Sequence, residues 1–187
     1  MAPGILIRVA YSWDRRGLAE DERWVRLATF IRQAAAEGLR RIRAQDLAAV
    51  TVDTGPHPDE SAPEATITAQ DAGVQVRVER LRASAGGWTW DSIHRKLQRT
   101  DILVCDLAKP QGRRAASPNI YLELGAFIGL HGASPRPWFL VSDHRGGHKV
   151  LPSDLQGQLV GTIGDHYDRS LFMTIANAVA ERALISL

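Results

Sequence analysis

The sequence DILVCDLAKPQGRRAASPNIYLELGAFIGL, residues 101–130, joins a strand-like segment to a helix-like one. Its first part places four apolar residues in a row before a carboxylate, Asp106, which is typical of a buried central strand. Its second part opens with a Ser-Pro pair, which favours a helix start, and continues with apolar residues on every side. We therefore expect a strand followed by a buried helix, whose glycines allow another element to approach closely.

Glu123 is the one charged residue of this predicted helix. By helical angle it falls between Phe127 and Leu130, inside the apolar arc. A buried, unpaired carboxylate costs several kcal/mol or becomes protonated, so such a residue is either paired or kept for chemistry. We predict a chemical role for Glu123. The structural alternative is an ion pair with Arg8 or Arg113 that anchors the helix.

The rest of the chain alternates strand-like and helix-like segments. Ile5–Ser12 predicts a strand, and the helical period of Asp21–Glu37 predicts a helix that stops at Gly38. Apolar strands that alternate with helices predict an α/β fold with an open, mainly parallel sheet of about five strands and helices on both faces. The other predicted strands are Leu47–Val52, Pro137–Ser142 and Leu159–Ile163, and the other helices are 91–98 and Asp168–Leu187.

Residues 47–85 depart from this pattern. They indicate an insertion into a single domain that spans residues 1–187. Within them, Thr66–Thr68 and Val74–Val78 flank a turn-like Asp71–Gly73, which predicts a β-hairpin. The second of these runs alternates polar and apolar residues, so one of its faces should be solvated. We therefore expect an edge strand or a β insertion here.

Composition excludes several classes of function. The net charge is only +2, and no aromatic residues interleave with the arginines of 40–43, which argues against a nucleic-acid partner. A single cysteine, Cys105, excludes an internal disulfide and a cysteine-only metal site. The six histidines show no metal-ligand spacing, so we expect no metal and no resident cofactor. No apolar run approaches ~18 residues, so we expect a soluble, cytoplasmic protein without a membrane segment.

Polar residues follow the predicted strands at the points where ligands bind in open α/β sheets, outside the carboxyl ends of the strands. We expect these polar residues to converge at one edge of the sheet. The residues are Tyr11, Ser12, Asp14, Asp106, Asn119 and Glu123.

Three segments together resemble the nucleoside 2-deoxyribosyltransferase-like and TIR-like group of flavodoxin-like (Rossmann-type) domains. They are ILIRVAYSWD at 5–14, TDILVCDLAKP at 100–110 and SPNIYLELGAFIGL at 117–130. In that group a strand ending in Asp precedes an Asn-x-x-x-Glu-x-Gly-x-Ala helix. This pattern is met by Asp106, Asn119, Glu123 and Gly125, while the alanine falls one place early, at Ala126. The resemblance leaves residues 40–85 unexplained.

The resemblance implies cleavage or transfer of an N-glycosidic bond on a nucleoside, a nucleotide or NAD, with NAD as a substrate, in a homo-oligomer. It implies Glu123 as the nucleophile or as the stabiliser of an oxocarbenium-like sugar, and Asp106 as the group that binds or orients the sugar. Tyr11 matches an aromatic residue that follows the first strand in the transferase branch. Trp88, Trp90 and Tyr121 are our own candidates to stack on the base.

Simpler roles stay open for several of these residues. Asp106 can bond to the loop that follows it, Asn119 can cap the helix, and one of Trp88 and Trp90 can belong to the core. At the level of function, the alternatives are a non-catalytic nucleotide-binding sensor and a TIR-like interaction module, as in bacterial defence or stress signalling.

Overall fold

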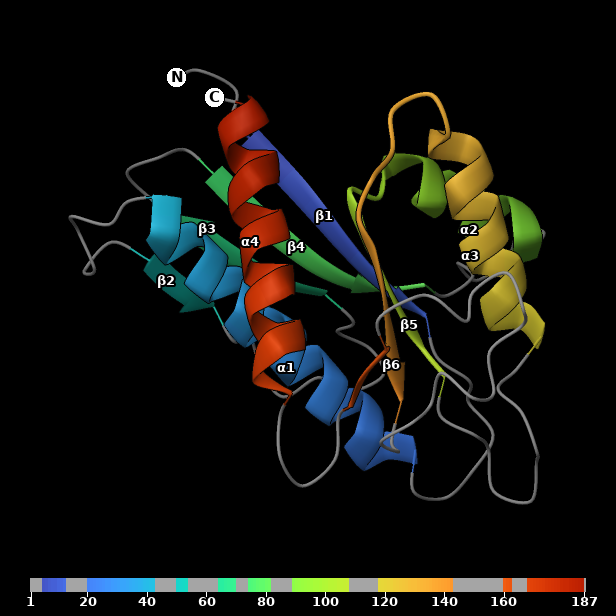
Figure 1. Ribbon diagram of the computed structural model, residues 1–187, viewed down its shortest axis with the longest axis horizontal. Helices are drawn as coiled ribbons and strands as arrows, with labels where there is room; N and C mark the ends of the chain where they lie inside the picture. The colour runs from blue at the N-terminus through green and yellow to red at the C-terminus, as the bar shows by residue number, and fades with distance from the viewer. Residues whose placement is uncertain are drawn as a thin grey trace.

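The computed structural model shows a sheet covered by helices on both faces (Figure 1). Asp14, Trp88 and Arg113 lie outside the residues that the structure describes, as does the turn of the predicted hairpin. The described residues are 5–12, 20–42, 50–53, 64–69, 74–81, 89–107, 118–142, 160–162 and 168–186.

The described residues form seven strands and four helices in an α/β arrangement. The strands are β1 (Ile5–Ser12), β2 (Val50–Asp53), β3 (Glu64–Ala69), β4 (Val74–Arg80), β5 (Ile102–Asp106), β6 (Trp138–Ser142) and β7 (Val160–Thr162). The helices are α1 (Glu20–Ile42), α2 (Thr89–Arg99), α3 (Pro118–His131) and α4 (Arg169–Ser186).

The strands have the order β2-β3-β4-β1-β5-β6-β7. Each neighbouring pair in the part β4-β1-β5-β6-β7 is parallel. Strands β3 and β2 extend the sheet beyond β4 by antiparallel pairing. Numbered among themselves, the parallel strands follow the order 2-1-3-4-5, which is compatible with a flavodoxin-like fold. The expectation that the Val74 run forms an edge strand is wrong, because β4 lies between β3 and β1. Its alternation arises because Gln75 is exposed while its flanking valines are buried.

Two core clusters, one on each side of the sheet, hold the layers together. On one side α1 and α4 pack on the valines of β4 and on Ile7 and Val9 of β1. On the other side α2 and α3 pack on Leu103, Cys105 and Leu140. Figure 1 shows α1 and α4 side by side, well apart from α2 and α3. Successive residues of a strand therefore enter different cores, as the period of two requires.

Helix α1 continues past the residue at which its sequence predicts a stop. Gly38 lies within α1, which ends at Ile42, so the predicted stop is wrong. Gly38 instead permits contact with α4, because a Cβ at this position would lie 2.9 Å from Val179 Cβ and against the backbone oxygen of Ala176. A glycine in a helix can mark a close helix–helix approach as well as a helix end.

Helix α3 is buried on one side only, which corrects the expectation of a helix buried all round. Leu124 and Phe127 enter the core, but Leu122 is 57% exposed and Ile128 is 40% exposed. A Cβ added at Gly125 or Gly129 would meet nothing within 4 Å. No described helix or strand therefore packs against these glycines, and this side of α3 is an exposed face that is uncharged and partly apolar.

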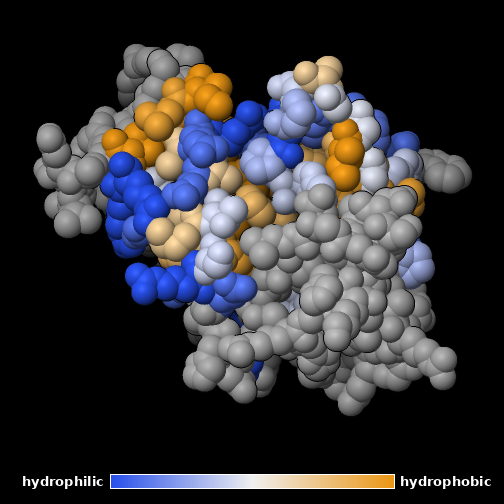
Figure 2. Space-filling view, viewed as in Figure 1, coloured by the Kyte–Doolittle hydropathy of each residue, from blue (hydrophilic) through white to orange (hydrophobic). Residues whose placement is uncertain are grey.

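Exposed apolar side chains also occur at the end of α4. Leu184 and Ile185 are 58% and 75% exposed, and Figure 2 shows hydrophobic atoms there, beside the end of the chain. Of the helices that the described ranges contain, none combines the length and the apolar character needed to cross a membrane.

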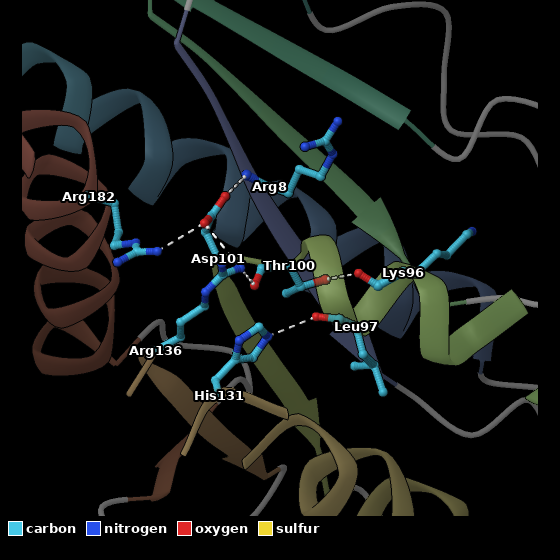
Figure 3. Close-up of polar contacts among 8 residues, drawn as sticks. All are labelled: Arg8, Lys96, Leu97, Thr100, Asp101, His131, Arg136 and Arg182. Atoms are coloured by element: carbon cyan, nitrogen blue, oxygen red, sulfur yellow. Dashed lines mark hydrogen bonds and ion pairs between the residues drawn. The ribbon is translucent and has the colours of Figure 1, made fainter. Parts of the chain in front are cut away.

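Asp101, directly before β5, joins three elements at the amino ends of the strands (Figure 3). Its Oδ2 accepts a hydrogen bond from the backbone N–H of Arg8 at 3.0 Å, and its own N–H donates to the Arg8 carbonyl at 2.9 Å. Its Oδ1 pairs with Arg182 of α4 at 3.1 Å and with Arg136 at 3.3 Å. Arg136 also donates to the Thr100 carbonyl at 2.5 Å. This carboxylate therefore links β1, β5 and α4.

We expect Asp101→Ala to lower the free energy of unfolding by about 2 kcal/mol, because it removes the side-chain acceptor of the Arg8 N–H and one acceptor from each of two partly buried guanidinium groups. Urea unfolding measures the change. Arg182→Gln is the matched control, since it removes one arm of the network and should cost less than half as much. Equal stability of Asp101→Ala and the wild type would show that the network contributes nothing.

Candidate functional site

The candidate site lies where the direction of the strand connections reverses. The chain goes from β1 to β4 on one side and returns to β5 on the other, so β1 and β5 are neighbours at the switch point. Ser12, the last residue of β1, is in register with Cys105 of β5. Open α/β sheets bind ligands outside the carboxyl ends of the strands at this place.

Glu123 and Ser12 meet at this edge. Glu123 projects from the second turn of α3, and Ser12 Oγ donates a hydrogen bond to Glu123 Oε2. Both side chains are buried, with Ser12 1% exposed and Glu123 9% exposed. The sequence singles out each residue by its own position, and the structure brings the two together across 111 residues of chain.

Burial raises the pKa of Glu123 from 4.5 to about 7, and the hydrogen bond from Ser12 opposes this rise. An ion pair would lower the pKa instead. No described residue, Arg8 included, forms an ion pair with Glu123. A carboxyl that titrates near pH 7 at the carboxyl edge of the sheet can donate or accept a proton under physiological conditions.

The Cys105 thiol is influenced by both candidate carboxylates. Burial raises the pKa of its thiol well above the usual value, and the charges of Glu123 and Asp106 raise it further. Both carboxylates therefore lie close enough to act on the same sulfur. The thiol stays protonated at neutral pH, so Cys105 packs as a small apolar residue and is not a nucleophile.

Asp106 and Asn119 lie near this pair but face differently. Asp106 ends β5 and is buried; alternation puts it in the series of Ile102 and Val104, which faces α1 and α4. Asn119 is exposed one helical turn before Glu123, on the same stripe of α3. Asn119 thus lies toward the rim above Glu123, while Asp106 approaches the same edge from the other side of the sheet.

Two aromatic candidates are not brought to Glu123. Tyr11 is 1% exposed in the core under α1, on the face opposite to Ser12. Tyr121 lies about 200° around α3 from Glu123, half-buried against the α2–α3 core. Trp90 is 39% exposed on α2 and lies beside His94. The roles of Asp14 and Trp88 stay predictions, because both residues lie outside the described ranges.

Sequence reasoning missed Ser142. This residue ends β6, is buried, and follows Leu140 by two positions, so alternation puts it on the same face as Cys105 and Glu123. Its signal was present in the sequence, because Ser142 closes the predicted strand Pro137–Ser142 at the carboxyl edge. The rule that selected Ser12 also selects Ser142.

We expect Ser12→Ala to raise the pKa of Glu123 further, because it removes the hydrogen bond that favours the ionised form. A titration of the Glu123 side-chain carboxyl by NMR measures the shift. The acid limb of any activity should move to higher pH, with a loss of about tenfold on that limb for each unit of pKa. Ser134→Ala, at an exposed serine after α3, is the control and should change neither. An unchanged or lowered Glu123 pKa in Ser12→Ala contradicts the role of the hydrogen bond.

Known proteins do not decide between functions for this site. The sequence matches no protein-family model, and a comparison with curated proteins gives no significant match. Within the described part of the chain, no group of three or more His, Cys, Asp or Glu side chains is placed to hold a metal ion.

Proposed function

We propose that this protein cleaves or transfers an N-glycosidic bond of a nucleoside, a nucleotide or NAD, with Glu123 at the reacting carbon. One observation carries the proposal: a buried carboxyl that has no charged partner among the described residues and is hydrogen-bonded to Ser12 at the switch point of the sheet. The resemblance of residues 5–14, 100–110 and 117–130 to nucleoside 2-deoxyribosyltransferase-like and TIR-like domains supports the same chemistry.

The proposed step uses the ionised form of Glu123. Its carboxylate oxygen attacks C1′ of the sugar, or stabilises the oxocarbenium-like sugar, as the C1′–N bond breaks and its electron pair leaves with the base. Water or a second base then displaces the carboxylate from C1′ in the first case, or adds to the cationic C1′ in the second, and the proton that it loses is taken up by the departing base. The positive charge that develops on the sugar as the C1′–N bond breaks favours the charged carboxylate, and so opposes the effect of burial on the Glu123 pKa.

The neighbouring polar residues have assigned roles in this proposal. Ser12 orients the carboxyl and stabilises its ionised form. Asn119, on the exposed first turn of α3, contacts the ligand at the rim. The resemblance assigns the binding of sugar hydroxyls to Asp106, which ends β5 at the rim and reaches it from the other face of the sheet. Tyr11 and Tyr121 have no role at C1′, because the first lies on the other face of the sheet and the second on the other side of α3.

The proposal is tested by incubating the purified protein with NAD and with a panel of ribonucleosides, deoxyribonucleosides and nucleotides, and separating the products by chromatography. We expect a free base to appear from at least one of them. A second, labelled base added to the mixture distinguishes transfer from hydrolysis, because only transfer incorporates the label. If no compound of the panel releases its base, the catalytic proposal is wrong.

A second candidate function is a TIR-like interaction module that senses a nucleotide without cleaving it. The observation that favours it is the open face of α3, where Leu122 and Ile128 are exposed and the two glycines between and beside them meet nothing. Nucleotide binding without base release, together with a change of oligomeric state measured by light scattering, would favour the module over the enzyme.

A further inference from the structure

A second polar cluster lies on the opposite face of the sheet from Glu123, beneath α1. Its centre is Tyr11, the residue before Ser12, whose side chain is 1% exposed within the core that α1 and α4 cover. The Tyr11 hydroxyl has no hydrogen-bond partner in the structure. A buried hydroxyl without a partner is destabilising, so a position of this kind suits an atom of a bound ligand.

Two arginines place positive charge around this hydroxyl. Arg80 of β4 is in register with Tyr11 across the parallel β1–β4 pair and is itself buried. Arg32 comes from α1, and its Nε is buried without a hydrogen-bond partner. Helix side chains lean toward the helix start, so Arg32 reaches back toward the carboxyl edge of the sheet, where Tyr11 lies.

The charges that act on Tyr11 are both positive. Burial raises the pKa of Tyr11 to about 12, and the Arg80 and Arg32 guanidinium groups oppose that rise. Burial lowers the pKa of Arg32 because part of its charge is removed from water. Asp106 ends β5 in the same facing series as Tyr11, yet the charges that shift the phenol are those of the two arginines. The cluster therefore combines the positive charge of two arginines with two donors that have no partner among the described residues, the Tyr11 hydroxyl and Arg32 Nε.

This set of donors suits an oxyanion. A guanidinium presents planar N–H donors that match phosphate oxygens, and a phenol adds one more donor of different geometry. The two guanidinium groups would repel a cation, and an apolar group would leave the Tyr11 hydroxyl and Arg32 Nε unpaired. We propose that Tyr11, Arg32 and Arg80 form a binding subsite for a phosphate group. The subsite and the Glu123 site lie on opposite faces of β1, one residue apart along the strand.

The phosphate has two sources that the same chemistry allows: free inorganic phosphate, or the phosphate of a nucleotide bound over the edge of the sheet. The second source rests on the proposed function, whereas the subsite itself does not. A failed subsite leaves the cleavage of unphosphorylated nucleosides intact. The two proposals can therefore fail separately.

Thermal unfolding and calorimetric titration at constant ionic strength test the subsite, with inorganic phosphate, AMP and adenosine as probes and chloride as the reference. Phosphate should raise the melting temperature of the wild type and of Arg99→Gln, an exposed arginine on α2 that serves as the charge-matched control. Arg32→Gln and Tyr11→Phe should weaken phosphate binding by at least about fivefold. Without phosphate, Tyr11→Phe should be as stable as the wild type or more stable, because it removes an unpartnered hydroxyl.

The probes separate the two sources. Weaker AMP binding in Arg32→Gln with unchanged adenosine binding assigns the subsite to a nucleotide, whereas an effect on inorganic phosphate alone assigns it to the free ion. Phosphate binding that is absent, or that is equal in the wild type, Arg32→Gln and Tyr11→Phe, overturns the proposal. A Tyr11→Phe protein that is destabilised without phosphate overturns it as well, because the hydroxyl would then have a partner within the protein.

Discussion

Glu123→Gln should abolish base release and, at pH 8, make the protein more stable than the wild type. Glutamine has nearly the same shape, keeps an oxygen that accepts the hydrogen bond from Ser12, and carries no charge. The loss of activity should exceed 100-fold, as expected for a carboxylate that acts at the reacting carbon. The gain in stability follows because the charged form of Glu123 is buried without a charged partner.

The pH dependence of this effect has a defined sign. Below about pH 4.5 the carboxyl is protonated in both the folded and the unfolded chain, so it contributes its full stabilisation. Between pH 4.5 and about 7 the unfolded chain releases the proton first, and the free energy of unfolding falls as pH rises. At 1.36 kcal/mol per pKa unit, the loss is on the order of 3 kcal/mol by pH 8. Glu123→Gln lacks this loss.

Urea unfolding of the wild type and Glu123→Gln at several values from pH 4 to pH 8 measures the effect. The difference between the two proteins should be small at pH 4 and should grow to a plateau above pH 7. Glu37→Gln, at an ion-paired and more exposed glutamate of α1, is the control, and should change stability by less than about 1 kcal/mol without this trend. A stability gain with full activity would show that Glu123 is buried but not catalytic. A constant difference at every pH would show that its pKa is ordinary.

Gly38→Ala should destabilise the protein by about 2 kcal/mol or more, although alanine is the better helix former by about 1 kcal/mol. The added methyl would lie 2.9 Å from Val179 Cβ and 3.1 Å from Val179 Cγ1, and would also meet the Ala176 backbone oxygen, which cannot rotate away. Helices α1 and α4 must then separate, and the core between them loses contacts. Thermal and urea unfolding measure the change.

Two other glycines provide matched controls for this substitution. Gly125→Ala and Gly129→Ala place the same methyl group on the open face of α3, where nothing lies within 4 Å. Each should be neutral or stabilising by up to about 1 kcal/mol, because alanine restricts the unfolded chain and favours the helix. Gly38→Ala as stable as these controls would contradict the close packing of α1 on α4.

The general architecture can be predicted from the sequence because apolar runs such as 102–105 have no solvated face, and such strands require helices on both sides. The face of the sheet on which a single side chain lies is harder to predict. Tyr11 and Ser12 both close the first strand, and only the register of β1 beside β4 and β5 shows that they enter different cores. Ser12 therefore belongs with Glu123, while Tyr11 belongs with Arg32 and Arg80.

The glycines show the other limit of sequence reasoning. Gly38 has the signal of a helix end and Gly125 has the signal of close packing, yet Gly38 packs on α4 and Gly125 faces open space. Both signals are local in sequence. Whether a glycine contacts another helix depends on whether a helix from a distant part of the chain packs against that position. Glu123 could be found from the sequence because a charge within an apolar arc is anomalous in any tertiary context.

The position of a bound sugar relative to Glu123 is the decisive test of Glu123 as the residue at the reacting carbon. Crystals of Glu123→Gln soaked with a nucleoside or with NAD should retain the uncleaved compound. We expect its anomeric carbon within about 3.5 Å of the residue 123 side chain, at the carboxyl ends of β1 and β5. A ribose bound elsewhere, with residues 12 and 123 still hydrogen-bonded to each other and closed to the ligand, would contradict the account.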